Sequence, residues 1–176
     1  MEQTEYWIRR ASPEDAAALA QVHETTWRQT YVGLMSEEML SALTADARTA
    51  AWRRILSGET GYLATTFVAE RSGALVAFSS CGEQRSQELA AAGYAGEFAA
   101  VYVLKTDQRR GLGTRLMGAM MDDLARRNLV GFTSWVPRTN IPVRSLYEQL
   151  GGKLIAQREV EEPGRLAEVA YGWTMR

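Results

Sequence analysis

The sequence predicts an α/β fold with one mixed sheet, and three observations lead to this prediction. The chain has 176 residues, 46% of them apolar and 23% charged, which fits a single globular domain over residues 1–176. Segments with the two-residue period of strands alternate with segments that have the helical period. A strand, a glycine turn and a helix follow one another without interruption from residue 97 onwards.

The N-terminal part is predicted to be one strand followed by helices. Tyr6–Arg10 is a short strand, and a helix begins at Ser12-Pro13-Glu14-Asp15, because a capping serine precedes a proline and an acidic residue. The helix carries a stripe that is predicted to face the core. Its members are Ala16, Leu19, Ala20, His23 and Trp27. Two shorter helices are expected at residues 36–43 and 47–56.

From residue 62 the pattern becomes that of strands. Phe67–Glu70 and Ala74–Phe78 form an expected antiparallel hairpin around the turn Arg71-Ser72-Gly73. Residues 83–95 are rich in Ala, Gln and Glu, and this composition fits either a loop or a short helix.

Glu97–Leu104 is predicted to be a central strand because, apart from Glu97, it is apolar on both faces. Strict alternation groups Glu97 with Ala99, Val101 and Val103 on one face. A turn and a helix with a broad apolar face follow. That face consists of Leu112, Leu116, Met117, Met120, Met121 and Leu124.

The C-terminal part is predicted to add three strands and one helix. Gly131–Val136 is a strand, and Asn140 caps a helix that ends at Gly151-Gly152. Lys153–Val160 and Ala167–Met175 form a closing hairpin around residues 162–164.

Composition argues against several classes of protein. The chain has 20 basic and 21 acidic residues and a net charge of -1, so it offers no basic excess for nucleic acid. A single cysteine, Cys81, makes no internal disulfide, and the first five residues lack the pattern of a secretion signal. No segment approaches the roughly 18 apolar residues of a membrane span. We therefore expect a soluble, cytoplasmic protein without nucleic-acid or membrane partners.

The turn at Gly111 and Gly113 has the chemistry of an anion site. A helix N-terminus presents free N–H groups, and the absence of Ser, Thr, Asp or Asn directly before Gly111 leaves them to a ligand such as a diphosphate. Leu116 occupies the third glycine position of the dinucleotide motif, and the lysine of the Walker motif is absent. The chain holds one histidine, which excludes a His-Glu-x-x-His zinc site, and no metal is expected.

These residues resemble the GNAT superfamily of acetyl-CoA-dependent N-acetyltransferases. Gln108-Arg109-Arg110-Gly111-Leu112-Gly113 is similar to the family's Q/R-x-x-G-x-G/A motif, and Asn140, Tyr147 and Leu150-Gly151 resemble its downstream helix. The resemblance covers Glu97–Gly151. It implies a GNAT-like acyl-CoA N-acyltransferase fold, with a mixed, mostly antiparallel sheet and helices on both faces. It also implies transfer of an acetyl group from acetyl-CoA to a primary amine.

The resemblance further implies which residues contact coenzyme A, in a gap where two parallel strands splay apart. Strand backbone would hold the acetyl carbonyl and pantetheine, and the glycine turn would hold the pyrophosphate. The implied cofactor-binding residues are Val101, Tyr102, Val103, Gln108, Arg109, Arg110, Gly111, Leu112, Gly113, Thr114 and Asn140.

Two residues are implied to move protons. Tyr147 stands where the family places the general acid, and a phenol with a pKa of about 10 can donate to a thiolate. Glu97 stands where some members carry a catalytic glutamate, whereas others have a base at the position of Trp135. The alternatives are a core tyrosine for Tyr147 and a solvated strand end for Glu97.

The acceptor side is less defined. The string from Trp27 to Gly33 resembles one that recurs in part of the family, which implies that Trp27 and Tyr31 contact the substrate; aromatic packing is the alternative. Small amines, amino acids, antibiotics and peptide amines all stay open as acceptors, as does a homodimer. A non-catalytic module that binds or senses coenzyme A is the rival function.

Overall fold

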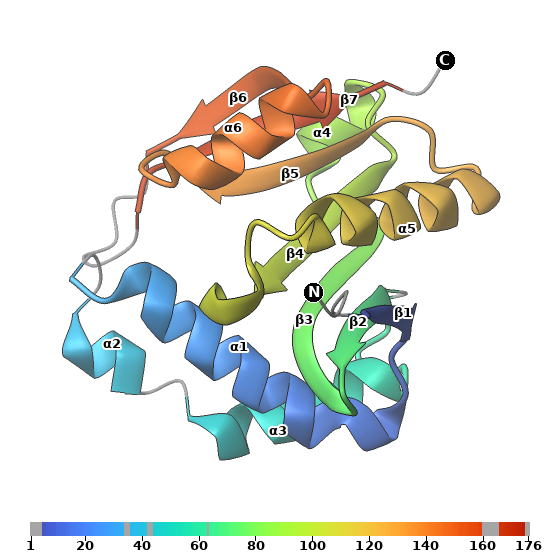
Figure 1. Ribbon diagram of the computed structural model, residues 1–176. Coiled ribbons are helices and arrows are strands. Elements are labelled where there is room, and N and C mark those ends of the chain that lie inside the picture. The colour runs from blue at the N-terminus through green and yellow to red at the C-terminus, as the bar shows by residue number, and fades with distance from the viewer. Residues whose placement is uncertain (1–4, 34–35, 42–43, 63, 160–165, 175–176) are drawn as a thin grey trace.

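The structure is a computed structural model that describes residues 5–33, 36–41, 44–62, 64–159 and 166–174. Across these ranges the chain forms one seven-stranded sheet with the order β1-β2-β3-β4-β5-β7-β6 (Figure 1). The β4–β5 pair is parallel and every other pair is antiparallel. The strands are β1 (Trp7–Arg10), β2 (Thr65–Arg71), β3 (Ala74–Glu83), β4 (Gly96–Val103), β5 (Phe132–Pro137), β6 (Lys153–Arg158) and β7 (Glu168–Trp173). The predicted mixed, mostly antiparallel sheet is confirmed.

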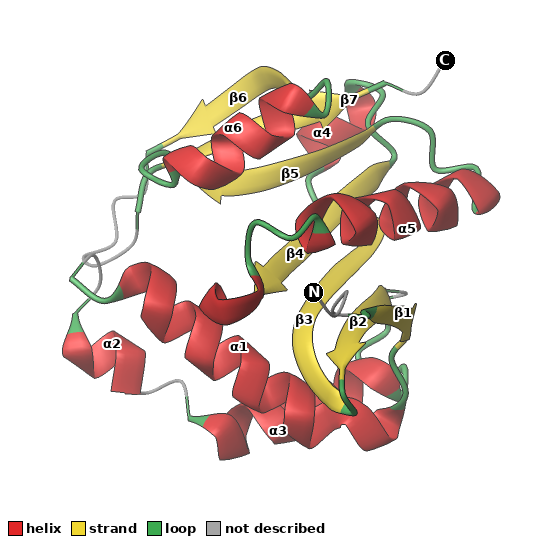
Figure 2. Cartoon of the chain, in the orientation of Figure 1, coloured by secondary structure: helices red, strands yellow, loops and turns green. Residues whose placement is uncertain are grey.

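The helices fall close to their predicted positions (Figure 2). They are α1 (Ala16–Tyr31), α2 (Glu37–Ser41), α3 (Ala45–Leu56), α4 (Gln87–Ala91), α5 (Leu112–Arg126) and α6 (Ile141–Gln149), with 3-10 turns at Pro13–Asp15 and Lys105–Asp107. The segment 83–95, which the sequence left open, contains the short helix α4. No helix in the described part of the chain is long and apolar enough to cross a bilayer.

Two apolar clusters hold the helices against opposite faces of the sheet. The larger cluster joins α5 and α6 to the sheet, and Leu116, Met117 and Tyr171 are buried within it. The smaller cluster joins α1 and α3 to the other face, through Leu19, Trp52 and Phe78. In Figure 1 the helices α1, α2 and α3 gather at one end of the molecule, while α6 lies along β5, β6 and β7.

β4 contains a bulge that changes which side chains face which helix. Ser80 pairs with Ala100 but Cys81 pairs with Phe98, so Ala99 is the extra residue. Phe98, Val101 and Val103 therefore contact the α5 cluster, whereas Ala100 and Tyr102 contact the α1 cluster. The strict alternation predicted for this strand is wrong, because an inserted residue reverses the phase.

β4 and β5 separate after a short parallel ladder. The ladder begins at Gly96 and ends at Phe98, which lies opposite Ser134. Beyond that point β4 stays paired with β3 and β5 with β7, but no pair joins β4 to β5 within the described strands. Figure 2 shows the arrowheads of these two strands pointing apart. The sheet is therefore open at its centre on the side where both strands end.

The N-terminal segment is fastened to the turn before α5. Tyr6 donates from its hydroxyl to Oδ1 of the fully buried Asp107 at 3.0 Å, and Arg71 forms an ion pair with the same carboxylate at 3.2 Å. Arg115 of α5 in turn donates to the backbone oxygen of Tyr6 at 3.0 Å. The residue that precedes the first strand is thus bonded both to the 3-10 turn before α5 and to α5 itself.

The closing hairpin forms, but its second strand lies inside the sheet. β7 pairs with both β5 and β6, so β6 becomes the edge. The predicted turn at residues 162–164 and the helix position Leu43 lie outside the described residues.

Candidate active site

The start of α5 has an open N-terminus. Gly111 is the N-cap residue with a φ of +77°, in the left-handed region that favours glycine, and it has no side chain with which to cap the helix. A Cβ at Gly111 would meet nothing within 4 Å, so the space beyond it is free. The helix dipole and the first N–H groups of a helix favour an anion at such an end.

The residues around this turn leave their charges available. Arg109 adopts a φ of +61°, and Arg109, Arg110 and Thr114 are exposed. Gln108 folds back instead, because its Nε2 donates to the carbonyl oxygen of Val103 at 3.0 Å. Gln108 therefore ties the turn to the end of β4, and two guanidinium groups stay exposed next to the open helix end.

A cavity lies where β4 and β5 separate. Its lining consists of residues 99–102 of β4, residues 134–137 of β5, Asn140, Val143 and Tyr147 of the α6 region, and Tyr31 at the end of α1. A second cavity adjoins it and shares Tyr31, Pro137 and Asn140. Residues from four distant parts of the chain thus meet at the opening of the sheet.

Tyr147 reaches this cavity from α6, although only 4% of the residue is exposed. Its hydroxyl lies 3.1 Å from Oγ of Ser134, which donates to the carbonyl oxygen of Phe98 at 3.2 Å. Burial raises the pKa of the Tyr147 phenol above its usual value, and the bond to Ser134 opposes that shift in part. The phenol therefore keeps its proton at neutral pH, as a general acid must.

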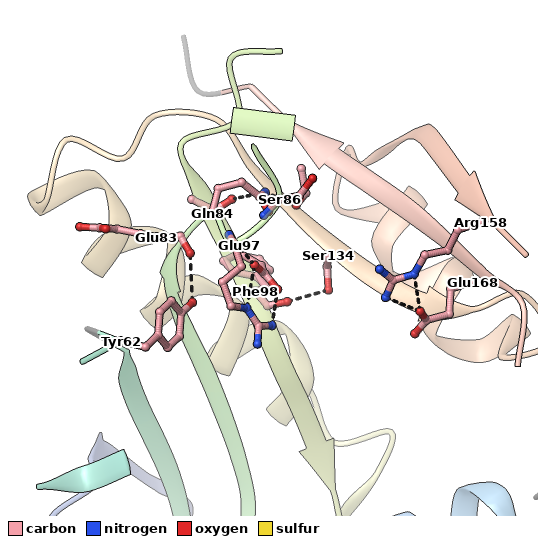
Figure 3. Close-up of polar contacts among 12 residues, drawn as sticks. Tyr62, Glu83, Gln84, Ser86, Glu97, Phe98, Ser134, Arg158 and Glu168 are labelled. Carbon is pink, nitrogen blue, oxygen red and sulfur yellow. Dashed lines mark hydrogen bonds and ion pairs between the residues drawn. The ribbon is translucent and has the colours of Figure 1, made fainter. Parts of the chain in front are cut away.

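Glu97 is buried, so the alternative that it lies at a solvated strand end is wrong. Arg85 donates three hydrogen bonds to its carboxylate. Nη2 lies 2.5 Å from Oε1, and both Nε and the backbone N–H donate to Oε2 at 3.1 Å. The guanidinium also lies over the ring of Tyr62, 5.4 Å from its centroid. Figure 3 shows Glu97 beside the end of the β4–β5 ladder, where Ser134 meets Phe98. Glu97 does not line either cavity described above.

Asn140 has two roles in the structure. Its Oδ1 accepts from the backbone N–H of Val143 at 3.4 Å and so caps α6, as predicted. It also lines both cavities, and among the described residues its side-chain nitrogen has no partner, so this nitrogen can donate to a ligand.

The aromatic residues of α1 divide between site and core. Tyr31 lines both cavities, and burial raises its pKa to about 12. Trp27 packs behind it with ring centroids 4.4 Å apart, but is absent from the lining. The structure therefore brings Tyr31 to the site and places Trp27 as its support.

Comparison with known proteins gives the family of this fold and site. Residues 80–160 match the model of the FR47-like protein family. The chain is 31% identical over 169 residues to YuaI of Bacillus subtilis (strain 168), described as an uncharacterized N-acetyltransferase, and the match covers 94% of this chain and 91% of that protein. The chain belongs to the GNAT family of N-acetyltransferases.

Solved structures share the GNAT fold at low sequence identity. The PaiA N-acetyltransferase of Thermoplasma acidophilum, solved with coenzyme A, superposes with a TM-score of 0.75 at 17% identity, over 97% of this chain and 99% of that one. The acetyltransferase YncA of Salmonella typhimurium, solved with acetyl-CoA, gives 0.70 at 22% identity, over 96% and 93%. Both likenesses concern the fold alone.

Sequence analysis of this GNAT chain missed two residues that touch the proposed acid and base. Ser134 was visible as a hydroxyl between Phe132 and Val136 on the core-facing side of a strand. Arg85 carried no local signal, because its partner lies 12 positions further along the chain. A residue that contacts a catalytic candidate can be predicted from sequence only when it is already known which face of the sheet each strand residue points to.

His23 is a packing residue of this GNAT domain and will stay neutral. Its ring lies 5.2 Å from that of Phe78 and 5.3 Å from that of Tyr102, and Nη1 of Arg48 lies 2.8 Å from its nitrogens. Burial, with the charge of Arg48, lowers its pKa to about 3. Below about pH 6.5 the histidine of the unfolded chain takes up a proton, whereas that of the folded chain stays neutral. The free energy of unfolding therefore has its full value above about pH 6.5 and decreases as pH falls towards 3. The loss at pH 5 should reach about 2 kcal/mol.

NMR tests this directly because the chain has one histidine. The imidazole carbon-bound protons should keep constant chemical shifts from pH 8 to pH 5. A titration with a midpoint near 6.5 would contradict the buried, neutral ring. Denaturant unfolding at both pH values should show the corresponding fall in stability.

Proposed function

We propose that this GNAT chain transfers the acetyl group of acetyl-CoA directly to the primary amine of a small molecule or peptide. The observation that carries the proposal is the cavity at the β4–β5 opening, which holds a protonated buried phenol on α6. The uncapped start of α5 packs on the same helix, because a Cβ at Gly113 would lie 3.4 Å from Leu146. The net charge of -1 argues against an acceptor bound to nucleic acid.

The chain offers a fitting place for coenzyme A. The open amides of α5 and the exposed Arg109 and Arg110 suit the pyrophosphate, because backbone donors and guanidinium groups both favour phosphate oxygens. Residues 101–103 lie beyond the end of the β4–β5 ladder, which leaves that edge of β4 to the pantetheine amides. Asn140 would add a side-chain amide at the same opening. When bound, acetyl-CoA supplies the activated thioester.

Two side chains would handle the protons. The amine nitrogen bonds to the acetyl carbon, the carbon–sulfur bond breaks, and Tyr147 donates its phenolic proton to the departing sulfur. Backbone N–H of Val101 or a neighbour would stabilise the charge on the carbonyl oxygen. We propose Glu97 as the base, acting through water, since it lies outside the cavity lining but on the strand that forms one wall.

Glu97→Gln tests this assignment. The amide keeps the size of the side chain but cannot take a proton, so kcat should fall at least about tenfold at pH 7 with the KM for acetyl-CoA unchanged. Steady-state kinetics checks this, and the melting temperature shows how much of any effect is structural. A variant that melts lower but turns over at the wild-type rate would make Glu97 only a partner of Arg85.

The function as a whole is tested with purified protein, acetyl-CoA and a panel of amines. Release of free thiol that requires both protein and amine supports acetyl transfer. Coenzyme A at 100 times its Kd should stabilise the fold by about 2.7 kcal/mol in thermal unfolding. Stabilisation without thiol release across the panel would favour the rival function, a module that binds or senses coenzyme A.

A further inference from the structure

Ser134 occupies the point where the sheet opens. It lies opposite Phe98, the last residue of the β4–β5 ladder, and its hydroxyl donates to the carbonyl oxygen of Phe98 at 3.2 Å (Figure 3). A buried carbonyl oxygen needs a hydrogen-bond donor. Ser134 supplies such a donor from its side chain to the last carbonyl of the ladder.

The same hydroxyl oxygen lies 3.1 Å from the hydroxyl of Tyr147. Both groups are buried, with 3% of Ser134 and 4% of Tyr147 exposed, and both line the cavity. A serine hydroxyl holds one proton. While Ser134 donates to Phe98, Tyr147 is the donor in its bond to Ser134.

We propose that Ser134 positions Tyr147 and stabilises it after proton transfer, by turning its own O–H from the Phe98 carbonyl to the phenolate oxygen. This inference rests on the proposed function, because it assumes that Tyr147 is the acid. The phenolic proton goes to the departing sulfur, the serine proton stays on Ser134, and solvent returns a proton to Tyr147 at the end of the cycle. Ser134 touches neither reacting atom and is a positioning residue.

The geometry supports a switch between two acceptors. The Phe98 carbonyl and the Tyr147 oxygen lie at nearly equal distances from Ser134 Oγ, 3.2 and 3.1 Å, so the hydroxyl can change partner by rotation alone. Ser134 also lowers the pKa of Tyr147 against the effect of burial, which is the direction expected of a donor to the phenolate. A bond to an ionised oxygen is stronger than one between neutral groups.

A double-mutant cycle with the full-length protein, acetyl-CoA and an amine from the panel tests this proposal. Ser134→Ala should lower kcat by about 10- to 100-fold, with little change in the KM for acetyl-CoA. Ser134→Thr, which keeps the hydroxyl, should restore most of the rate. In a Tyr147→Phe background, Ser134→Ala should have almost no further effect, because the residue acts through the phenol.

Ser79→Ala is the matched control. Ser79 is a fully buried serine on β3, and its hydroxyl has no hydrogen-bond partner among the described residues, so its removal should leave kcat unchanged. Additive losses in the cycle would overturn the role of Ser134 while leaving acetyl transfer in place. Full activity of Tyr147→Phe would overturn the acid assignment itself, and with it the role of Ser134. Wild-type rates in Ser134→Ala would overturn the role of Ser134 alone.

Discussion

Tyr147→Phe should lower kcat by about 100- to 1000-fold while coenzyme A still binds. The variant removes a hydroxyl and keeps the ring that packs 5.3 Å from Trp173 and 5.7 Å from Tyr171, so the core is preserved. Without the phenol, the sulfur must leave unprotonated or take its proton from water, and general acids typically contribute about 10² to 10⁴ in rate. Steady-state assays of thiol release measure the decrease in kcat.

Tyr171→Phe is the control for this variant. Tyr171 is also a buried phenol of the same cluster, but its hydroxyl contacts Glu148 at 2.5 Å and Arg144 at 3.2 Å and it is absent from the cavity lining. Its turnover should stay near the wild-type rate. If both variants turned over equally, Tyr147 would be a core tyrosine, which is the alternative that the sequence left open.

The second large effect should come from the start of α5. Gly111→Asp puts a carboxylate at the helix N-terminus, where it would occupy the N–H groups and repel a diphosphate. We expect the Kd for coenzyme A to rise at least about 100-fold, which corresponds to about 2.7 kcal/mol. Isothermal titration calorimetry measures the affinity, and loss of the thermal shift provides a second readout.

Gly58→Asp separates this effect from backbone strain. Gly58 follows α3 with a φ of +78°, almost the same as the +77° of Gly111, and a Cβ there also meets nothing within 4 Å. Both variants therefore introduce the same residue at nearly the same positive φ, and both should lose some stability. Only Gly111→Asp should bind coenzyme A more weakly. Equal affinities in the two variants would remove the helix end from the site.

Local pattern was enough to predict most elements of this fold. The cap at Asn140, the glycine turn before α5 and the apolar face of α5 each depend on residues within one continuous segment, so the sequence displays them directly. The order of the strands depends on pairing between distant segments. Nothing local indicates that β7 inserts between β5 and β6.

In the candidate site, too, local features were predictable and contacts between distant segments were not. The glycine motif and the position of Tyr147 followed from spacing and resemblance, but the bulge at Ala99 did not, because one extra residue in an apolar strand leaves no mark on composition. Ser134 and Phe98, which share a hydrogen bond, lie 36 positions apart in the sequence, and Arg85 and Glu97 lie 12 positions apart. Contacts of this kind follow from the three-dimensional pairing, and they determine how the proposed acid and base are held.

We expect the affinity for coenzyme A to depend on the bond from Tyr6 to Asp107, although these two residues lie 101 positions apart in the sequence. Asp107 lies at the end of the 3-10 turn that leads into Gln108 and the glycine motif, and Tyr6 before β1 and Arg71 at the end of β2 both bond to it. A fusion partner or binding protein that displaced Tyr6 would remove a contact of the turn before α5 without touching the glycine motif itself. We therefore expect changes in the segment that leads into the first strand to alter acetyl transfer through the turn before α5.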